Sequence, residues 1–392
     1  MSNINKNLKS AMAKLNKKFP NSVKFGNEIE AIEYLPTPSN DFNEMLGTPG
    51  LAKGKVIEFY GENSSGKTSY AIEIIAHNQR LEKEKALAKG LDDYDFTTCW
   101  FETEESFDRE YAERLGVDMS KVIYWDQRDM TGEQGLDTLI SMVSSGAVNL
   151  CIVNSIAGIV PTKELEGEMQ DQNMALVARM LSKLFRIVTG PASKNKCTMI
   201  FINQVRATMN QYSPEESCGG KALKFYASTR VRMGKVKLQA GDPLTAEEGI
   251  KVNCSVLKNR FCNGGNPYTK CSYYARYNMG IDNLATFPNM LIKYNVAVQK
   301  AAWIRVENEE GDVETILGVP CKWNGKNAFL DVIRQNEGLR KELEKRLNDK
   351  MLGITKADSL SEEEINIIKK EEASTPDFEE EFGIDSKEAT IV

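Results

Sequence analysis

Short apolar runs alternate with amphipathic stretches along most of the chain, between about residues 36 and 280. Runs such as Leu150-Cys-Ile-Val153 are apolar at every position, which is typical of strands buried on both faces of a parallel sheet. Helical stretches separate these runs, most clearly at 172–188. This order predicts an α/β fold with a doubly wound, mostly parallel sheet. The predicted strands are residues 56–60, 98–102, 122–125, 150–153, 197–203, 228–234 and 251–258.

Two segments flank this core. Near the N-terminus, Leu8, Met12, Leu15 and Phe19 recur at helical spacing and form one apolar stripe. A short helix with such a stripe needs a cover, either its own core or a neighbouring subunit. Residues 285–350 predict a small α/β domain that ends in a charged helix. The predicted parts are therefore an N-terminal helical segment, a core, a small C-terminal domain and a tail, at residues 1–35, 36–284, 285–350 and 351–392.

The composition is that of an ordinary soluble protein, with 392 residues, 41% apolar and 27% charged. No apolar run approaches the roughly 18 residues of a membrane helix, and the N-terminus lacks a secretory signal. We therefore expect a cytoplasmic protein with no membrane partner. The eight cysteines are scattered without a C-x-x-C pair, which favours reduced thiols. Because His77 is the single histidine, carboxylates must do any acid–base chemistry.

The charge is distributed unevenly. Residues 361–392 contain eleven acidic and three basic side chains, so this end has a net charge of −8 and the rest of the chain +2, against −6 overall. An acidic tail on a mildly basic body suggests that the tail competes with a polyanion for that body. A solvated end that aids solubility explains the same composition equally well.

The most specific motif is Gly61-Glu-Asn-Ser-Ser-Gly-Lys-Thr68, which matches the phosphate-binding pattern G-x-x-x-x-G-K-[ST]. Lys67 reaches the β- and γ-phosphates of a nucleotide, and Thr68 offers its hydroxyl to Mg²⁺. A predicted strand precedes the loop and a predicted helix follows it, so a helix N-terminus adds positive potential there. We expect a nucleoside triphosphate held by Gly61, Glu62, Asn63, Ser64, Ser65, Gly66, Lys67, Thr68 and Ser69.

Polar residues follow three other predicted strands, at the edge where sheets of this kind bind nucleotides. Glu102 and Glu104 share a face by strand alternation, so one of them is a candidate for orienting the attacking water; a solvated acidic turn is the alternative. Asn154 stands where a P-loop protein carries a metal-binding aspartate, and it lacks the negative charge that Mg²⁺ prefers. After the third strand, Arg206 and Tyr212 fit either a nucleic-acid-binding loop or a plain surface loop.

Together these segments resemble the RecA family of bacterial and bacteriophage recombinases, from about residue 14 to residue 347. Besides the P-loop, the resemblance rests on Thr131-Gly-Glu-Gln134, Phe201-Ile-Asn-Gln204, Gly219-Gly220 and Ala222-Leu-Lys-Phe-Tyr-Ala-Ser228. It implies a RecA-type P-loop ATPase core with an N-terminal helix for oligomerisation and a small C-terminal domain.

The resemblance also implies ATP as the nucleotide and a role for individual residues. Glu104 would activate water and Gln204 would sense the γ-phosphate, which with Lys67 makes the catalytic set. Thr68 and Asn154 would lie at the metal. The adenine would be held by Asp108 and Tyr111, and the nucleotide of the next subunit would be reached by Lys258 and Arg260. DNA loops would lie at 164–171 and 204–220, with contacts from Arg179, Arg186, Arg206, Tyr212, Gly219 and Gly220, and the subunit interface would include Lys224, Phe225 and Arg230.

The chain departs from the family pattern at three points. Asn154 replaces an aspartate, which puts fast hydrolysis in doubt. Arg260 replaces the usual lysine, and its planar guanidinium still clamps phosphate. The second DNA loop is about two residues shorter than in typical bacterial members.

The implied function is homologous recombination. Subunits would assemble head to tail into a helical filament on single-stranded DNA, pair it with homologous duplex, exchange strands and hydrolyse ATP when DNA is bound. A single-strand-binding or mediator protein is a further candidate partner. The rival predictions are a ring-forming helicase or loader on the same core, a filament former with very weak ATPase owing to Asn154, and a small-molecule kinase, for which we find no acceptor-binding motif.

Overall fold

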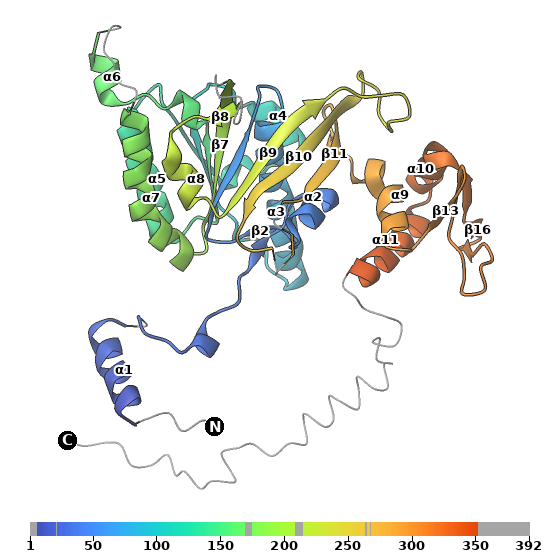
Figure 1. Ribbon diagram of the computed structural model, residues 1–392, viewed down its shortest axis with the longest axis horizontal. Helices are drawn as coiled ribbons and strands as arrows, with labels where there is room; N and C mark the ends of the chain where they lie inside the picture. The colour runs from blue at the N-terminus through green and yellow to red at the C-terminus, as the bar shows by residue number, and fades with distance from the viewer. Residues whose placement is uncertain are drawn as a thin grey trace. The chain divides into compact units, whose positions relative to one another are not determined.

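The computed structural model describes residues 6–20, 22–168, 175–207, 215–262, 265–266 and 268–351. The chain divides into two compact units, Met1–Ala285 and Thr286–Val392. The predicted fold class is confirmed, because a large, mostly parallel sheet with helices on both faces forms the first unit (Figure 1). In the described residues, no helix has both the length and the apolar character needed to cross a membrane.

A ten-stranded sheet holds the first unit together. Its parallel strands lie in the order β9-β3-β7-β6-β4-β5; β10, β11 and β12 extend it antiparallel beyond β9, and β8 pairs with β7. Each of the seven predicted strands is confirmed. The strands are β3 Val56–Gly61, β4 Thr98–Glu102, β5 Val122–Asp126, β6 Leu150–Asn154, β7 Thr198–Ala207, β8 Glu215–Ser217, β9 Thr229–Val236, β10 Gly249–Asn259, β11 Lys270–Arg276 and β12 Gly280–Ile281.

The strand β7 is longer than predicted and changes the expected loop. It continues to Ala207 because β8 pairs with its end, with Val205 opposite Ser217. The segment that follows β8 contains the short helix α8, Lys221–Tyr226. The second predicted DNA loop, at 204–220, is therefore partly strand, and within it residues 208–214 lie outside the described residues.

Helices cover both faces of the sheet, each set over its own apolar cluster (Figure 1). One face carries α2 (Asn40–Leu46), α3 (Lys67–Ala88) and α4 (Arg109–Arg114). The opposite face carries α5 (Gly132–Ser145), α7 (Leu176–Lys194) and α8. Other elements of this unit are α1 Lys6–Lys18, β1 Tyr34–Leu35, β2 Leu51–Ala52 and α6 Thr162–Glu166.

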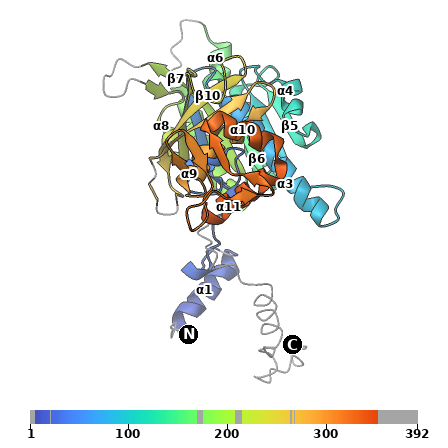
Figure 2. The ribbon, with the colours of Figure 1, turned by 90° about the vertical axis from the view of Figure 1, so that its right-hand side faces the viewer.

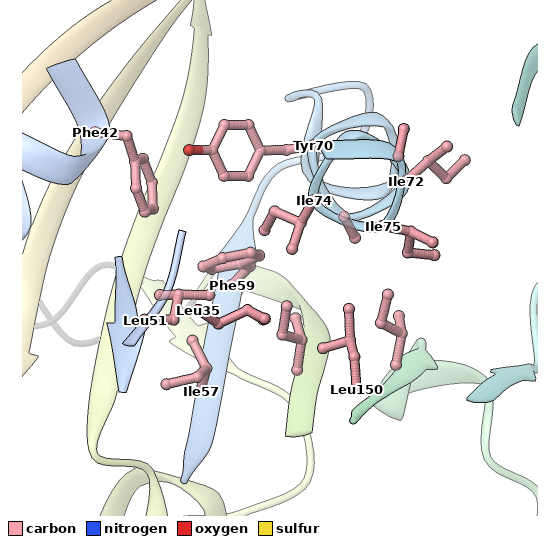
Figure 3. Close-up of a cluster of buried hydrophobic side chains, with 14 of the residues drawn as sticks. Leu35, Phe42, Leu51, Ile57, Phe59, Tyr70, Ile72, Ile74, Ile75 and Leu150 are labelled. Carbon is pink, nitrogen blue, oxygen red and sulfur yellow. The ribbon is translucent and has the colours of Figure 1, made fainter. Parts of the chain in front are cut away.

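Aromatic packing fixes the helix α3 on the strand β3 (Figure 3). Tyr70 is buried, and its ring lies 4.7 Å from that of Phe42 and 5.8 Å from that of Phe59. Its hydroxyl donates a hydrogen bond of 2.9 Å to Thr37 Oγ1. Aromatic pairs of this kind add about 0.5–1.5 kcal/mol each beyond their buried area. The packing therefore holds rigidly the loop that joins β3 to α3.

The N-terminal helix α1 confirms the helix predicted from the apolar stripe. Leu8, Leu15 and Phe19 are about half exposed, so the stripe is open to a cover. What covers it stays a prediction.

The second unit is a small α/β fold (Figure 2). Trp323 and Phe329 form its aromatic centre, with an edge-to-face ring distance of 4.8 Å. The helix α9, Asn283–Lys293, joins the two units in sequence. The unit contains β13 Val298–Lys300, β14 Trp303–Arg305, β15 Thr315–Ile316, β16 Val319–Pro320, β17 Lys322–Asn324, α10 Gly325–Gln335 and α11 Glu337–Met351. The predicted tail at 351–392 lies outside the described residues except for its first residue, Met351.

Candidate functional site

The P-loop lies between the end of β3 and the start of α3 and curls around the Lys67 ammonium. Lys67 Nζ donates to Gly61 O at 3.0 Å, to Glu62 O at 2.6 Å and to Ser65 Oγ at 3.2 Å. A Cβ on Gly61 would lie only 2.0 Å from Met233 O, so this turn requires glycine. The loop thus has the small, closely approached backbone that a polyphosphate needs.

Lys67 is almost fully buried, which shapes its electrostatics. Burial lowers the pKa of Lys67, while the nearby Glu104 and Glu62 carboxylates oppose that shift. A buried ammonium with few charged partners gains strongly from an incoming anion. This supports a nucleotide phosphate as its natural ligand.

The carboxyl ends of neighbouring parallel strands bring four predicted polar side chains together beside Lys67. Thr68 Oγ1 donates to Asn154 Oδ1, at the end of β6, at 3.2 Å. Gln204 Nε2, in β7, donates to Glu104 Oε1 at 2.7 Å. The cluster therefore contains a hydroxyl, an amide, a carboxylate and a second amide around the P-loop, as the sequence predicts.

The expected strand alternation of Glu102 and Glu104 is wrong, because β4 ends at Glu102 and Glu104 lies in the bend that follows. The two carboxylates consequently have different surroundings. Glu102 is completely buried, whereas Glu104 is exposed. Of the two, only Glu104 is accessible to a water molecule at the nucleotide.

Sequence reasoning missed two residues that support Glu104. Ser155 Oγ donates a short hydrogen bond to Glu104 Oε1. Thr103 fixes Ser155 in turn, since its hydroxyl donates to Ser155 O at 2.7 Å and accepts from Ser155 N at 2.9 Å. The signal was available for Ser155, because it directly follows the end of a buried parallel strand.

A magnesium ion fits this cluster through oxygen ligands. Thr68 Oγ1 and Asn154 Oδ1 lie side by side at the P-loop, and both are oxygen donors of the hard type that Mg²⁺ takes. Within the described ranges, no group of three or more His, Cys, Asp or Glu could hold a metal ion. A Mg²⁺ bound with a nucleotide draws most of its ligands from phosphates and water, so these two oxygens suffice.

The residues predicted to hold adenine lie at the start of α4, beside α3. Asp108 caps this helix by accepting a 2.9 Å hydrogen bond from Tyr111 N. Tyr111 packs against the apolar cluster of α3, and its hydroxyl bonds to Ser69. Burial raises the pKa of Tyr111, so the ring stays a neutral, flat surface. Tyr111 therefore lies against the apolar cluster that contains the P-loop helix, and Asp108 caps the helix α4 that carries it.

Lys258 and Arg260 lie near the other end of the sheet from the P-loop. Lys258 Nζ donates to Lys224 O at 2.8 Å and to Phe225 O at 2.9 Å, and Arg260 Nη2 donates to Phe225 O at 3.3 Å. The backbone of Arg260 bonds to Ser228, which bonds in turn to Val56 at the amino end of β3. These two cations are thus not part of the P-loop site of their own chain.

The predicted DNA-binding residues surround the β7–β8 pair and α7. Arg179 and Arg186 are exposed on α7, and Arg206 is exposed near the end of β7. Gly219 and Gly220 both have positive φ, and a Cβ on either would lie within 3 Å of an α7 side chain. Tyr212 lies outside the described residues, as do positions 169–171 of the first predicted loop.

The three predicted interface residues differ in their surroundings. Phe225 is 68% exposed, which is unusual for a large aromatic side chain, and Lys224 beside it is partly exposed. Arg230 instead points inward, where it forms a salt bridge with the buried Glu58 and lies over the Tyr60 ring. Sequence reasoning missed Glu58, although a single acid in the apolar strand β3 was the available signal.

Known proteins are similar to this chain in sequence. The family described as RecA N-terminal domain matches residues 6–282. Protein RecA of Acidothermus cellulolyticus is 33% identical over 336 residues, which cover 85% of this chain and 88% of that protein. Protein RecA of Acinetobacter baylyi is 32% identical over 358 residues, covering 89% and 93%, and that of Acinetobacter baumannii is 32% identical over 372 residues, covering 92% and 97%.

Proposed function

We propose that this chain, which belongs to the RecA family, is an ATP-dependent DNA recombinase. It assembles head to tail on single-stranded DNA, pairs that strand with homologous duplex and exchanges strands. Binding of ATP drives assembly, and DNA-stimulated hydrolysis to ADP and phosphate drives filament turnover.

The observation that carries this proposal is the 2.7 Å hydrogen bond from Gln204 to Glu104. Glu104 belongs to the nucleotide cluster, whereas Gln204 lies in the strand that leads into the predicted second DNA loop. A γ-phosphate placed between them competes for the Gln204 amide and shifts the strand pair β7–β8. ATP and DNA therefore act on the same structural element.

The residues of the cluster have separate tasks in hydrolysis. Lys67 binds the phosphates, and Glu104, held by Ser155 and Gln204, orients the attacking water and accepts its proton. Thr68 and Asn154 would hold Mg²⁺, which would supply neutralisation of the charge that develops on the phosphate oxygens. Asp108 and Tyr111 hold the base.

The position of Lys258 and Arg260 supports an assembly in which one subunit completes the site of the next. Both side chains lie near the amino end of β3, whereas the P-loop follows its carboxyl end. Six strand residues span roughly 17–20 Å, so these cations reach a nucleotide only in another copy of the chain. A head-to-tail contact that includes Phe225 brings them there and builds an open helical filament.

The proposal is tested by ATP hydrolysis measured with and without single-stranded DNA, with negative-stain images of the same samples. Lys67→Ala is the blank, because it removes the buried ammonium at the phosphates. DNA-stimulated turnover together with helical filaments is the expected result. Rings, or hydrolysis indifferent to DNA, would instead favour a helicase, a loader or a metabolic P-loop enzyme.

If filaments form without ATP hydrolysis, the assembly of the family is retained and the loss of hydrolysis is assigned to Asn154. That variant of the proposal is a filament former with very weak ATPase.

A further inference from the structure

The two ends of the Asn154 amide face different partners. Its Oδ1 accepts from Thr68 Oγ1 at 3.2 Å, on the P-loop side. Its Nδ2 donates to Glu102 Oε2 at 3.0 Å, to Glu102 Oε1 at 3.3 Å and to Ser106 Oγ at 3.0 Å. An ionised carboxylate only accepts hydrogen bonds, so Glu102 fixes which end of the amide faces the P-loop.

Glu102 is a fully buried carboxylate whose hydrogen-bond donors are neutral. Trp100 Nε1 donates to it at 2.8 Å, Glu104 N at 2.9 Å, and Asn154 Nδ2 donates as described. Indole, backbone and amide N–H groups stabilise an anion without cancelling its charge. The Glu102 carboxylate therefore lies one side chain away from Thr68, with Asn154 between them.

We infer that Glu102 supplies, through Asn154, the negative charge that the metal site lacks at position 154. The carboxylate locks the amide so that its oxygen faces the metal, and it polarises that oxygen. Glu102 is thus a positioning residue, and the Glu102–Asn154 pair replaces a single metal-binding acid. The inference rests on the proposed nucleotide site, and its test separates the two.

The contact between Glu102 and Asn154 changes what we expect when an aspartate is introduced at position 154. Asn154→Asp introduces a second carboxylate at hydrogen-bonding distance from Glu102, where neither side chain is exposed. Two like charges in such contact repel, and the amide donor is lost. We therefore expect Asn154→Asp to weaken metal binding at this site, unless Glu102 is neutralised at the same time.

The test measures the affinity of a fluorescent ATP analogue with saturating Mg²⁺ and without metal, and takes the ratio of the two. We expect Glu102→Gln to lower this ratio about tenfold, as loss of an outer-shell partner does in other metal sites, while the metal-free affinity stays equal or improves. Damage to the fold alone would weaken both affinities together. A ratio within about twofold of the wild type would overturn the inference.

A double-substitution cycle sharpens the result. Asn154→Asp alone is expected to lower the ratio, and Glu102→Gln added to it is expected to raise the ratio again, because one charge then remains in the pair. Effects that simply multiply would contradict the inference. Thermal unfolding of each apo variant, followed by circular dichroism, identifies any variant that fails to fold.

Ser106→Ala is the matched control. It removes the hydroxyl that accepts from Asn154 Nδ2 at 3.0 Å and donates to Glu102 Oε1 at 3.4 Å, and it leaves the number of charges unchanged. We expect the ratio to change by less than about twofold. An effect as large as that of Glu102→Gln would assign the role to geometry and overturn the charge argument. Equal analogue binding by Lys67→Ala and the wild type would instead overturn the proposed nucleotide site itself.

Discussion

Two glutamates on strands of the same sheet, Glu58 in β3 and Glu102 in β4, are both completely buried, but their partners differ in charge. Glu58 forms a salt bridge with Arg230 and accepts from Asn203 Nδ2 at 2.9 Å. Within the described residues, the donors to Glu102 are all neutral and come from Trp100, Glu104 N, Asn154 and Ser106. Removing the cation of a buried ion pair is costly because it leaves an uncompensated charge, so the two glutamates should respond differently when a partner is removed.

The position of Glu58 also joins it to the predicted DNA and interface surfaces. Asn203, its amide partner, donates as well to Cys218 O at 3.0 Å, at the base of the second predicted DNA loop. Arg230 lies in β9, which leads from α8 and the exposed Phe225. The buried pair of Glu58 and Arg230 therefore helps to position the backbone beneath the predicted DNA and interface surfaces.

Removing the cation from Glu58 should have the largest effect. Arg230→Ala leaves a buried carboxylate without its partner, so we expect the free energy of unfolding to fall by about 4 kcal/mol in urea titrations. The control is Arg232→Ala on the same strand, whose pair with Glu62 is exposed and 4.0 Å apart, and whose loss should cost less than about 1 kcal/mol. Equal costs for the two variants would mean that burial of Glu58 does not demand the cation.

Removing a neutral donor from Glu102 should cost somewhat less. Trp100→Phe deletes the 2.8 Å indole hydrogen bond to the carboxylate and leaves a small cavity, for a loss of about 3 kcal/mol. The measurement is again urea unfolding of the apo protein.

A matched tryptophan separates the hydrogen bond from the cavity. Trp125 is also buried, and in the described part of the chain its Nε1 has no hydrogen-bond partner. Trp125→Phe should therefore cost about 1 kcal/mol or less. If both substitutions cost the same, the indole donor of Trp100 does not stabilise Glu102.

A third buried acid, Glu73 in α3, forms no salt bridge with any described residue. Its carboxylate accepts from Ile281 N at 2.6 Å, and burial raises its pKa to about 7 from 4.5. Between pH 4.5 and 7 the folded protein keeps a proton that the unfolded chain has released, so folding stability falls as the pH rises through this window.

Glu73→Gln should remove that loss. We expect the variant to exceed the wild type by about 2 kcal/mol at pH 8 and by far less at pH 4.5, in urea unfolding at both values. Comparing the two proteins at each pH cancels the contribution of His77, whose pKa burial lowers to about 4. A difference that is the same at both pH values would contradict the assigned pKa shift.

The sequence predicts the sheet and the P-loop well because local residue patterns determine both. Continuous apolar runs define β4 and β6, and the spacing of Gly61, Gly66, Lys67 and Thr68 is specific. The length of β7 was not predictable in the same way, because its last residues are held by β8 across a gap in sequence.

The candidate site was only partly predictable, for a related reason. The predicted roles of Glu104, Asn154 and Gln204 rest on their place at or near the carboxyl ends of buried strands. The contact of Asn154 with Glu102 joins residues that are 52 positions apart, and no local pattern encodes it. The internal partner of Arg230 was hidden in the same way, since Glu58 lies on a different strand.

The central claim is that the nucleotide site controls DNA binding through Gln204. Its most direct test is fluorescence anisotropy of labelled single-stranded DNA, with and without a non-hydrolysable ATP analogue, for the wild type and for Gln204→Ala. We predict that the analogue tightens DNA binding of the wild type by about tenfold or more and leaves that of Gln204→Ala nearly unchanged. Equal tightening in both proteins would contradict the account.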